Sequence, residues 1–252
     1  MDIVVIPDAQ VDPKHPVDFL ESIGKYIVAK RPDMVVNLGD FGELASLSSY
    51  DKGTKAYEGL RYAEDVTYIK NAMVKLLKPI ATLQRKQLKS KIKMYRPQLH
   101  LLLGNHENRI NKAIFHDPVK LEGIISLKDL EYEEFGWTVH PFLDPFITDD
   151  IYFNHYVPTG VGRYATTASA VLKNTMMSAV VGHSPGLQIA QSKRGDGRQL
   201  TAVIAGSCYE HDMYYFTPNS NRHFRGILHL YEVEKGSFLA KPVSLDHLRK
   251  NY

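Results

Sequence analysis

The sequence predicts a mixed α/β (α+β) fold in which two sheets form one domain. Short apolar runs alternate with helical stretches in the first half of the chain, which is typical of strands covered by helices. Strand patterns follow one another across short turns in the second half, so antiparallel pairs are expected there. Because we find no internal repeat, low-complexity segment or linker, we expect residues 1–252 to form a single domain.

Five buried strands are predicted in chain order, because each run is mostly aliphatic and ends at turn or polar residues. These runs are IVVIP (3–7), MVVNL (34–38), LHLLL (99–103), IYFNH (151–155) and SAVVG (178–182). In the second half, further strands are predicted at GLQIAQSK (186–193), QLTAVIAG (199–206), GILHLYEV (226–233) and SFLAKPVSL (237–245). The glycines of RGDGR (194–198) suit a hairpin turn between the first two of these.

Helices are predicted in the first two gaps between the buried strands. The segment PVDFLESIGKYIVAK (16–30) fills the first gap, and a basic helical insertion at about 55–97 fills the second. Pro79 predicts a kink or a break in this insertion. The apolar residues of the insertion recur at steps of three and four, as in an amphipathic helix, and are Val66, Ile69, Met73, Leu76, Ile80 and Leu83.

The insertion also carries an uneven share of the charge. No acidic residue lies between Asp65 and Glu107, whereas nine lysines and arginines stand from Lys70 to Arg96. Since the net charge of the whole chain is only +3, the remainder is acidic on balance. Two interpretations stay open: the positive charges belong to a solvated helix face, or they contact the phosphate backbone of DNA or RNA.

Nothing in the sequence indicates export or a membrane span. The first residues, MDIVVIP, have no basic n-region, no long apolar core and no cleavage site, so they are expected to form a strand. No apolar stretch approaches the ~20 residues of a transmembrane helix. The single cysteine, Cys208, cannot form an internal disulfide and is expected to be a packed thiol. We therefore expect a cytoplasmic protein without membrane contact.

Polar side chains follow each of the five buried strands. In open α/β sheets, functional groups collect beyond the carboxyl ends of the strands. A mixture of carboxylate, amide and imidazole groups suits Mn²⁺, Fe or Zn²⁺ better than Ca²⁺ or Mg²⁺, and Asp40 could bridge two ions. The sequence therefore predicts a divalent metal centre. Its candidate residues are Asp8 and Gln10 in PDAQ, Asp40 in GDFGE, Asn105 and His106 in GNHENR, His155 in FNHY and His183 in VVGHSP.

The order of the motifs GD, GNHE, H and GH resembles that of the calcineurin-like metallophosphoesterases, from Asp2 to about His183. This resemblance implies a four-layer α-β-β-α sandwich of two mixed sheets, with a two-metal site at the strand ends. It implies one set of metal ligands for each of the two ions. The first metal would be held by Asp8, Gln10 and Asp40, and the second by Asp40, Asn105, His155 and His183.

Three further residues receive catalytic roles. The resemblance implies that His106 donates a proton to the leaving group or stabilises the transition state, and that Glu43 orients His106. Arg109, in NHENR, is expected to clamp phosphate oxygens through its paired donors. Two metals and an in-line water would then hydrolyse a phosphate ester.

The first metal site departs from the family pattern at two positions. Gln10 stands where the family usually has histidine, and Pro185 stands where a second histidine often follows GH. Only oxygen ligands remain, so the first site is expected to bind more weakly than the second. Mn²⁺ is the expected ion, with Fe, Zn²⁺ or Mg²⁺ as other candidates. His211, in CYEHD, is a candidate replacement ligand.

The remaining chemistry-bearing residues are expected to have structural roles. Asp12 and Asp51 are expected in loops. Tyr209 belongs to an aromatic group, with Tyr214, Tyr215 and Phe216, for which two roles stay open: lining a substrate pocket or filling the core. The histidines expected to be structural are His15, His100, His116, His140, His223, His229 and His247.

The sequence thus predicts a metal-dependent phosphoesterase, a hydrolase of phosphate monoesters (a phosphatase) or diesters. The basic stretch from Lys70 to Arg96 favours phosphodiesterase or nuclease-type substrates. The alternative is a nucleic-acid-binding protein on a metal site that has lost activity, which Gln10 and Pro185 favour. The presence of His106 together with the predicted metal ligands argues against this alternative, because a site that had lost its activity would not need to keep a proton donor.

Overall fold

Two mixed sheets lie face to face at the centre of the structure, a computed structural model that describes residues 1–49, 52–213 and 217–252. Asp51, Tyr214, Tyr215 and Phe216, for which roles were predicted above, lie outside these ranges. The first sheet has the order β13-β12-β1-β2-β3-β4. Its strands are β1 (Ile3–Ile6), β2 (Met34–Asn37), β3 (Gln98–Leu102), β4 (Thr138–His140), β12 (Gly226–Glu234) and β13 (Ser237–Ser244).

The second sheet has the order β10-β11-β9-β6-β5. Strands β6, β9 and β11 run parallel, while β5 and β10 pair antiparallel at the two edges. A separate two-stranded ribbon consists of β7 (Pro158–Gly160) and β8 (Arg163–Tyr164). The strands of the second sheet are β5 (Phe146–Thr148), β6 (Ile151–Asn154), β9 (Ser178–Val181), β10 (Leu187–Lys193) and β11 (Gln199–Ala205).

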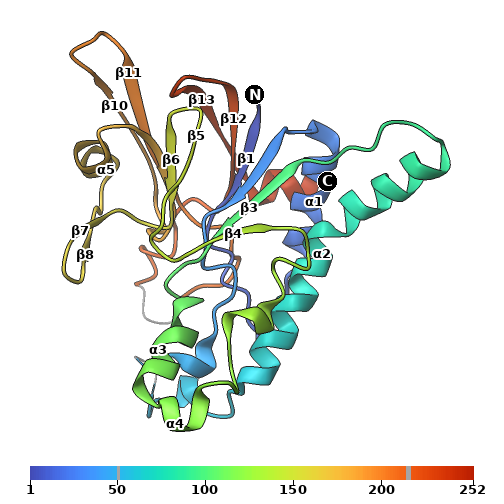
Figure 1. Cartoon of the computed structure of the whole chain (residues 1–252), viewed down its shortest axis with the longest axis vertical. Helices are drawn as coiled ribbons and strands as arrows, with labels where there is room; N and C mark the ends of the chain where they lie inside the picture. Colours follow the sequence, from blue (N-terminus) through green and yellow to red (C-terminus); the bar gives the residue numbers. More distant parts are fainter. Residues whose placement is uncertain (50–51, 214–216) are drawn as a thin grey trace.

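Helices cover the outer faces of both sheets, as Figure 1 shows, with α1 and α2 on one side and α5 on the other. None of the described helices is long and apolar enough to cross a membrane. The α-helices are α1 (Phe19–Lys30), α2 (Tyr62–Lys89), α3 (Asn108–His116), α4 (Pro118–Leu121), α5 (Ala168–Thr175) and α6 (Leu245–Asn251). Short 3-10 helices are η1 (Ala45–Leu47), η2 (Lys55–Tyr57) and η3 (Leu127–Leu130).

Alternating side chains of β1 explain why the layers pack in this way. Val4 and Ile6 face a cluster that includes residues of α1 and α2, whereas Ile3 and Val5 face the cluster between the two sheets. A third cluster joins the outer face of the second sheet to α5, through residues such as Val171. The central strands β1, β2 and β9 therefore bury both faces. The predicted α-β-β-α sandwich of two mixed sheets is confirmed.

The predicted break at Pro79 does not occur. Helix α2 continues through Pro79 as one element, although a proline in a helix interior removes a backbone hydrogen bond. Tertiary packing offsets this loss, because the buried stripe of α2 (Ile69, Met73 and Leu76) lies against α1 and the first sheet. The residues predicted as a basic insertion at about 55–97 thus contribute part of the core through α2.

Candidate metal centre

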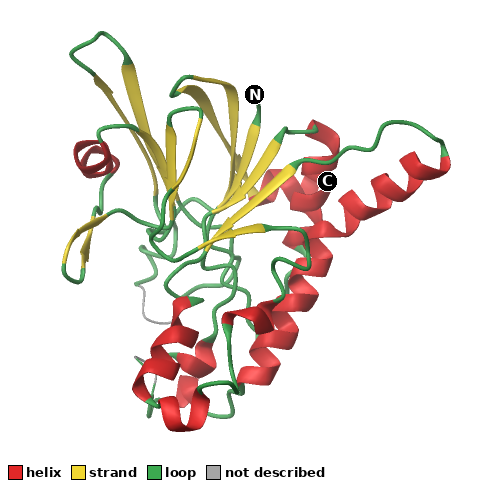
Figure 2. Ribbon diagram, viewed as in Figure 1, coloured by secondary structure: helices red, strands yellow, loops and turns green. Residues whose placement is uncertain are grey.

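The carboxyl ends of strands from both sheets bring the predicted ligands together. Figure 2 shows the loops gathered below the lower ends of the strands. In the first sheet, β1, β2 and β3 run parallel and therefore end at one edge. In the second sheet, β6 and β9 do the same. The residues that follow these strands are Asp8 and Gln10 after β1, Asp40 after β2, Asn105 and His106 after β3, His155 after β6 and His183 after β9.

Three other potential ligands converge on His155. Its Nε2 lies 2.9 Å from Oδ1 of Asn105, 3.3 Å from Oδ2 of Asp40 and 3.2 Å from Nδ1 of His183. On the other side of the ring, Nδ1 lies 2.9 Å from the carbonyl oxygen of Leu38. A carbonyl only accepts, so this contact keeps a proton on Nδ1 and directs Nε2 towards the other ligands. These Asp and His groups are positioned to hold a metal ion.

Burial and neighbouring charges shift the pKa values of the two histidines of this cluster in opposite directions. Burial alone would lower the pKa of His155, but the nearby carboxylates of Asp40 and Asp8 outweigh it and raise that pKa to about 9. Burial, together with the neighbouring His155, lowers the pKa of His183 to about 4. Burial would raise the pKa of Asp40, yet His106 and His155 together lower it below its usual range. Asp40 is therefore ionised and His183 neutral near pH 7, as ligands must be.

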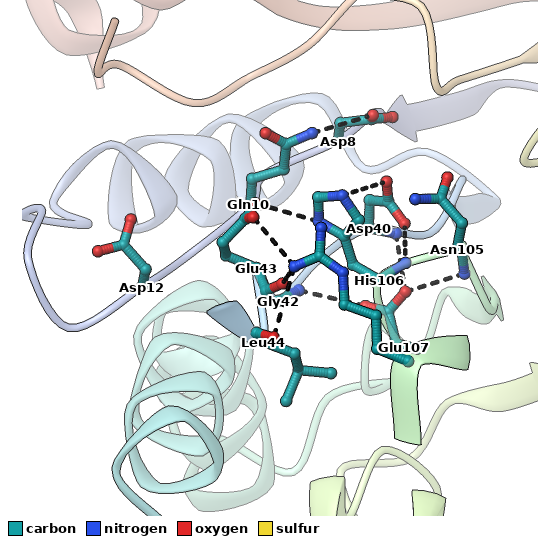
Figure 3. Close-up of polar contacts among 12 residues, drawn as sticks. Asp8, Gln10, Asp12, Asp40, Gly42, Glu43, Leu44, Asn105, His106 and Glu107 are labelled. Carbon is teal, nitrogen blue, oxygen red and sulfur yellow. Dashed lines mark hydrogen bonds and ion pairs between the residues drawn. The ribbon is translucent and has the colours of Figure 1, made fainter. Parts of the chain in front are cut away.

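Asp8, Gln10 and Asp40 form a second, oxygen-lined group beside the first. Nε2 of Gln10 lies 3.5 Å from Oδ2 of Asp8, and Figure 3 shows the amide nitrogen pointing to Asp8 and the amide oxygen pointing away. That oxygen, Oε1, is buried without a hydrogen-bond partner. Burial raises the pKa of Asp8 to about 7. With its amide turned end for end, Gln10 would present this oxygen beside the buried carboxyl group of Asp8. The three side chains would then offer a donor set that fits a metal preferring oxygen.

The backbone of three of these residues is left-handed. The φ angles are 42° for Gln10, 48° for Asp40 and 64° for His183. Such angles are uncommon outside glycine and cluster at functional sites. Backbone contacts hold them: the N–H of Gln10 donates to the carbonyl of Asp40 at 2.9 Å, and the N–H of His183 donates to Oδ1 of Asp8 at 2.9 Å. The chain thus bends sharply at each ligand, which aims these side chains at one place.

Glu107 supports the centre from below, and no role was predicted for it. Its carboxylate is fully buried and accepts from the backbone N–H groups of Asp40 at 2.9 Å, Gly42 at 3.2 Å and Gly104 at 2.9 Å, as drawn in Figure 3. The hydroxyl of Tyr132 lies 3.3 Å away. One side chain therefore fixes the loops after β2 and β3 against each other. The sequence signal that could have identified Glu107 is its position directly after Asn105 and His106 in GNHE.

Only glycine fits at Gly104. A Cβ there would overlap Oδ1 and the backbone nitrogen of Asp40. The ends of β2 and β3 can therefore approach closely, and Oδ1 of Asp40 accepts from the N–H of His106 at 2.8 Å.

His106 lies between two carboxylates. Its Nδ1 is 3.0 Å from Oε2 of Glu43, and its Nε2 is 3.6 Å from Oδ2 of Asp40. Burial would lower the pKa of His106, but Asp40 and Glu43 outweigh it and raise the pKa. Arg109 holds the same loop, because its Nη1 donates to the carbonyl of Glu43 at 2.6 Å and lies 3.2 Å from Oε1 of Glu43. The structure thus brings the three predicted catalytic residues together.

A cleft of about 700 Å³ opens above these residues. Asn105, His106 and His183 lie in its wall, so the centre is accessible from this side. Glu43 is the one carboxylate among the described lining residues, against the cations Arg109, Lys112 and Arg163. The remaining lining residues are Ser48, Leu143, Tyr156, Pro158, Gly160, Gly162 and Tyr164.

His211 lies in a different group from the predicted ligands. The structure places it with Asp12 and His15, whose rings and carboxylate also offer ligand atoms close together. The imidazoles of His15 and His211 are stacked with centroids 4.0 Å apart, and Nδ1 of His15 lies 2.6 Å from Oδ2 of Asp12. In Figure 3 the carboxylate of Asp12 points away from Asp40.

Sequence patterns found the residues at strand ends and missed the walls of the cleft. Lys112, Arg163 and Tyr164 follow no buried strand, and no periodicity or motif marked them. Tyr156 directly follows His155 in FNHY, but no role was predicted for it. Their position depends on how the β7–β8 ribbon and α3 fold over the centre. No family model matches this chain, and no curated protein matches it in sequence.

Proposed function

We propose that this protein is a metal-dependent phosphoesterase that hydrolyses phosphate monoesters or diesters. The observation that carries the proposal is the convergence of Asp40, Asn105 and His183 on Nε2 of His155, with His106 beside them at the wall of an open cleft. The motif order GD, GNHE, H and GH, which resembles the calcineurin-like metallophosphoesterases, supports the same function.

Two divalent ions would be held by two donor sets that share Asp40. Nitrogen and oxygen donors from Asn105, His155, His183 and Asp40 suit Mn²⁺, Fe or Zn²⁺. Asp8, Gln10 and Asp40 offer oxygen alone, which suits Mn²⁺ or Mg²⁺ and binds more weakly. When bound, the ions supply Lewis-acid polarisation of the phosphoryl oxygens and a water of lowered pKa.

His106 is the proton donor in this proposal. Asp40 and Glu43 raise its pKa, which favours the protonated form that can donate. Glu43 lies at Nδ1, 3.0 Å away, which leaves Nε2 for the leaving oxygen. Arg109 fixes the backbone of Glu43, and so holds the position of this pair.

The cleft suits an anionic substrate. Lys112 and Arg163 are exposed at its rim, and Arg109 lies deeper. Cations on several walls attract phosphate and can bind its oxygens while the ester group extends along the cleft. An open cleft of this volume has room for substituents on both sides of a phosphodiester, which favours diester substrates.

The test is hydrolysis of bis-p-nitrophenyl phosphate and p-nitrophenyl phosphate with added Mn²⁺. We expect Asp40→Asn to abolish turnover by removing the shared ligand. We expect His106→Asn to lower kcat by about 10²- to 10⁴-fold while Mn²⁺ binding persists. His247→Asn, at an exposed position in α6, is the matched control. Absence of turnover of both esters with Mn²⁺, Zn²⁺, Fe²⁺ and Mg²⁺ would reject the proposal.

A nucleic-acid-binding protein without turnover is the second candidate. The observation that favours it is the exposed basic end of α2 and the loop after it, which comprises Arg85, Lys86, Lys89, Lys91, Lys93 and Arg96. Salt-sensitive DNA binding without metal-dependent turnover would select this candidate.

A further inference from the structure

Aromatic and basic side chains from the β7–β8 segment border the cleft beside the metal centre. Tyr156 precedes β7, and Arg163 and Tyr164 form β8. All three line the cleft together with the potential ligands Asn105 and His183. We name Tyr156, Arg163 and Tyr164 the ribbon subsite.

The residues next to the two tyrosines hold this segment on the second sheet. Val157 and Ala165 are buried in the cluster shared with α5, and the N–H of Ala165 donates to the carbonyl of Val157 at 2.9 Å. Tyr156 and Tyr164 belong to none of the three clusters formed by the described residues. Adjacent side chains in extended backbone point to opposite sides. Because Val157 and Ala165 point into the core, the rings of Tyr156 and Tyr164 point into the cleft.

The aromatic surface begins directly at the metal centre. The ring of Tyr164 contacts the ring of His183 edge to face, with centroids 4.5 Å apart and an interplanar angle of 86°. The ring of Tyr156 lies 4.9 Å from His183 and 5.4 Å from Tyr164. A group attached to a phosphate at the centre therefore meets a tyrosine ring as its first neighbour on this side.

The tip of the ribbon stands free of the core. Val161 is fully exposed at 103%, and Gly160 and Gly162 flank it. A two-stranded ribbon without a third strand gains little stability from its own pairing. Exposed loops on a rigid scaffold commonly carry binding residues, and this one places the Arg163 guanidinium at the rim of the cleft.

Resting on the proposed function, we propose that the ribbon subsite binds the nucleoside part of a nucleotide substrate. The ring of Tyr164 stacks on the base, Tyr156 supports it, and Arg163 binds a phosphate. Every nucleobase has a flat face that stacks on an aromatic ring, and the arginine fork matches phosphate oxygens. The substrate class is therefore a phosphate ester of a nucleoside, and the ribbon determines specificity without taking part in bond breaking.

The test is equilibrium binding of the non-hydrolysable phosphonate analogue of thymidine monophosphate, and of inorganic phosphate, to the full chain with Mn²⁺, measured by calorimetry. We expect the nucleotide to bind at least about tenfold more tightly than phosphate, from base stacking. Tyr164→Ala should abolish this preference and leave phosphate binding unchanged. Tyr164→Phe should keep it, because the ring remains. Arg163→Gln should weaken both ligands.

Two results overturn the subsite: equal affinity for both ligands, or an unchanged affinity ratio in a folded Tyr164→Ala protein. Should Tyr164→Ala not fold, Tyr164→Leu gives the answer, because it keeps apolar volume at this position but removes the ring and should lower the same affinity ratio. Because binding is measured without turnover, the two proposals fail separately. Ester hydrolysis without nucleotide preference rejects the subsite alone, and nucleotide preference without hydrolysis rejects the phosphoesterase alone. Tighter binding of a 5′-phosphorylated single-stranded oligonucleotide than of the mononucleotide identifies a DNA end as the source of the nucleotide.

Discussion

A metal ion at the candidate metal centre competes with protons for the same ligand atoms. The pKa of His155 is about 9 without metal, so an ion that binds below this pH must displace a proton. His183, with a pKa of about 4, is already neutral and adds no pH dependence above about pH 5. The raised pKa of His155 also stabilises the metal-free fold, fully below its ordinary pKa of 6.5 and no longer above about 9.

We therefore expect metal affinity to rise with pH, by up to about tenfold per unit, and to level off above about pH 9. The ion bound through His155 should release about one proton near pH 7.5. Calorimetric titration of Mn²⁺ or Zn²⁺ in buffers of different ionisation enthalpy measures both quantities. His183→Asn should weaken binding without changing the pH slope. A flat affinity between about pH 6.5 and 8.5 would contradict the assigned role of His155.

Glu107 makes a prediction about stability. Glu107→Ala leaves the N–H groups of Asp40, Gly42 and Gly104 buried without their acceptor. We expect the free energy of unfolding to fall by about 3 kcal/mol or more, since each unsatisfied buried donor costs about 1–3 kcal/mol. Urea denaturation measures this loss. The exposed Glu134→Ala should change it by less than about 0.5 kcal/mol, and an equal effect of both variants would refute the support role.

The contact between α1 and α2 depends on a glycine. Gly24 lies in α1, and a Cβ there would overlap the carbonyl oxygen of Leu76 and come within 2.9 Å of the Pro79 ring. Helix propensity favours Gly24→Ala by about 1 kcal/mol, but overpacking typically costs about 1–3 kcal/mol. We expect the cost of overpacking to exceed the gain in helix propensity, so that Gly24→Ala lowers the urea midpoint of unfolding. Lys25→Ala, on the exposed side of α1, should leave this midpoint unchanged. A higher midpoint for Gly24→Ala would show that the two helices can separate without loss.

Length and burial decide which elements the sequence could predict. The five buried strands were predicted because each forms an aliphatic run that fills both faces of a layer. Strands β4 and β5 have three residues each and lie at sheet edges, so they leave no periodic pattern. Of the two outcomes predicted at Pro79, a kink or a break, the break does not occur, because tertiary packing of α2 outweighs a local propensity. The candidate ligands could be predicted because the carboxyl ends of parallel strands meet at one edge of a sheet. The roles of Glu107 and Tyr164 could not be predicted, because they depend on contacts between segments far apart in the sequence.

The candidate metal centre and the basic end of α2 lie toward opposite ends of the parallel strands of the first sheet. The metal centre lies where the parallel strands end, whereas the C-terminal end of α2 leads back to the start of β3 and projects at the upper right in Figure 1. Lysines in the first part of α2 are paired within the chain: Lys70 with Glu131 at 2.8 Å and Lys75 with Asp18 at 2.5 Å. The charge that is free to attract a polyanion is therefore concentrated far from the candidate catalytic residues.

This separation predicts independent effects on DNA binding and turnover. Replacing Lys86, Lys89 and Lys93 by Gln should weaken salt-dependent binding of DNA and lower the slope of log affinity against log salt by about one per lost phosphate contact. Hydrolysis of bis-p-nitrophenyl phosphate should be unchanged. The matched control replaces Lys70, Lys75 and Lys78 and should leave DNA affinity nearly intact. Equal losses for both triple variants in fluorescence anisotropy would show that only net charge matters.

The left-handed backbone at Asp40 and His183 restricts the amino acids that can stand there. Asp, Asn, His and Gly adopt this conformation readily, whereas β-branched residues do not. The requirements of metal binding and of the left-handed backbone thus favour almost the same few amino acids at these two positions. A descendant that lost its metal would carry Asn or Gly at these positions, and Val or Ile would have to remodel the loop first. Asn or Gly at these two positions in a related sequence would therefore indicate loss of the ion with the loop retained, whereas a β-branched residue would indicate a remodelled loop.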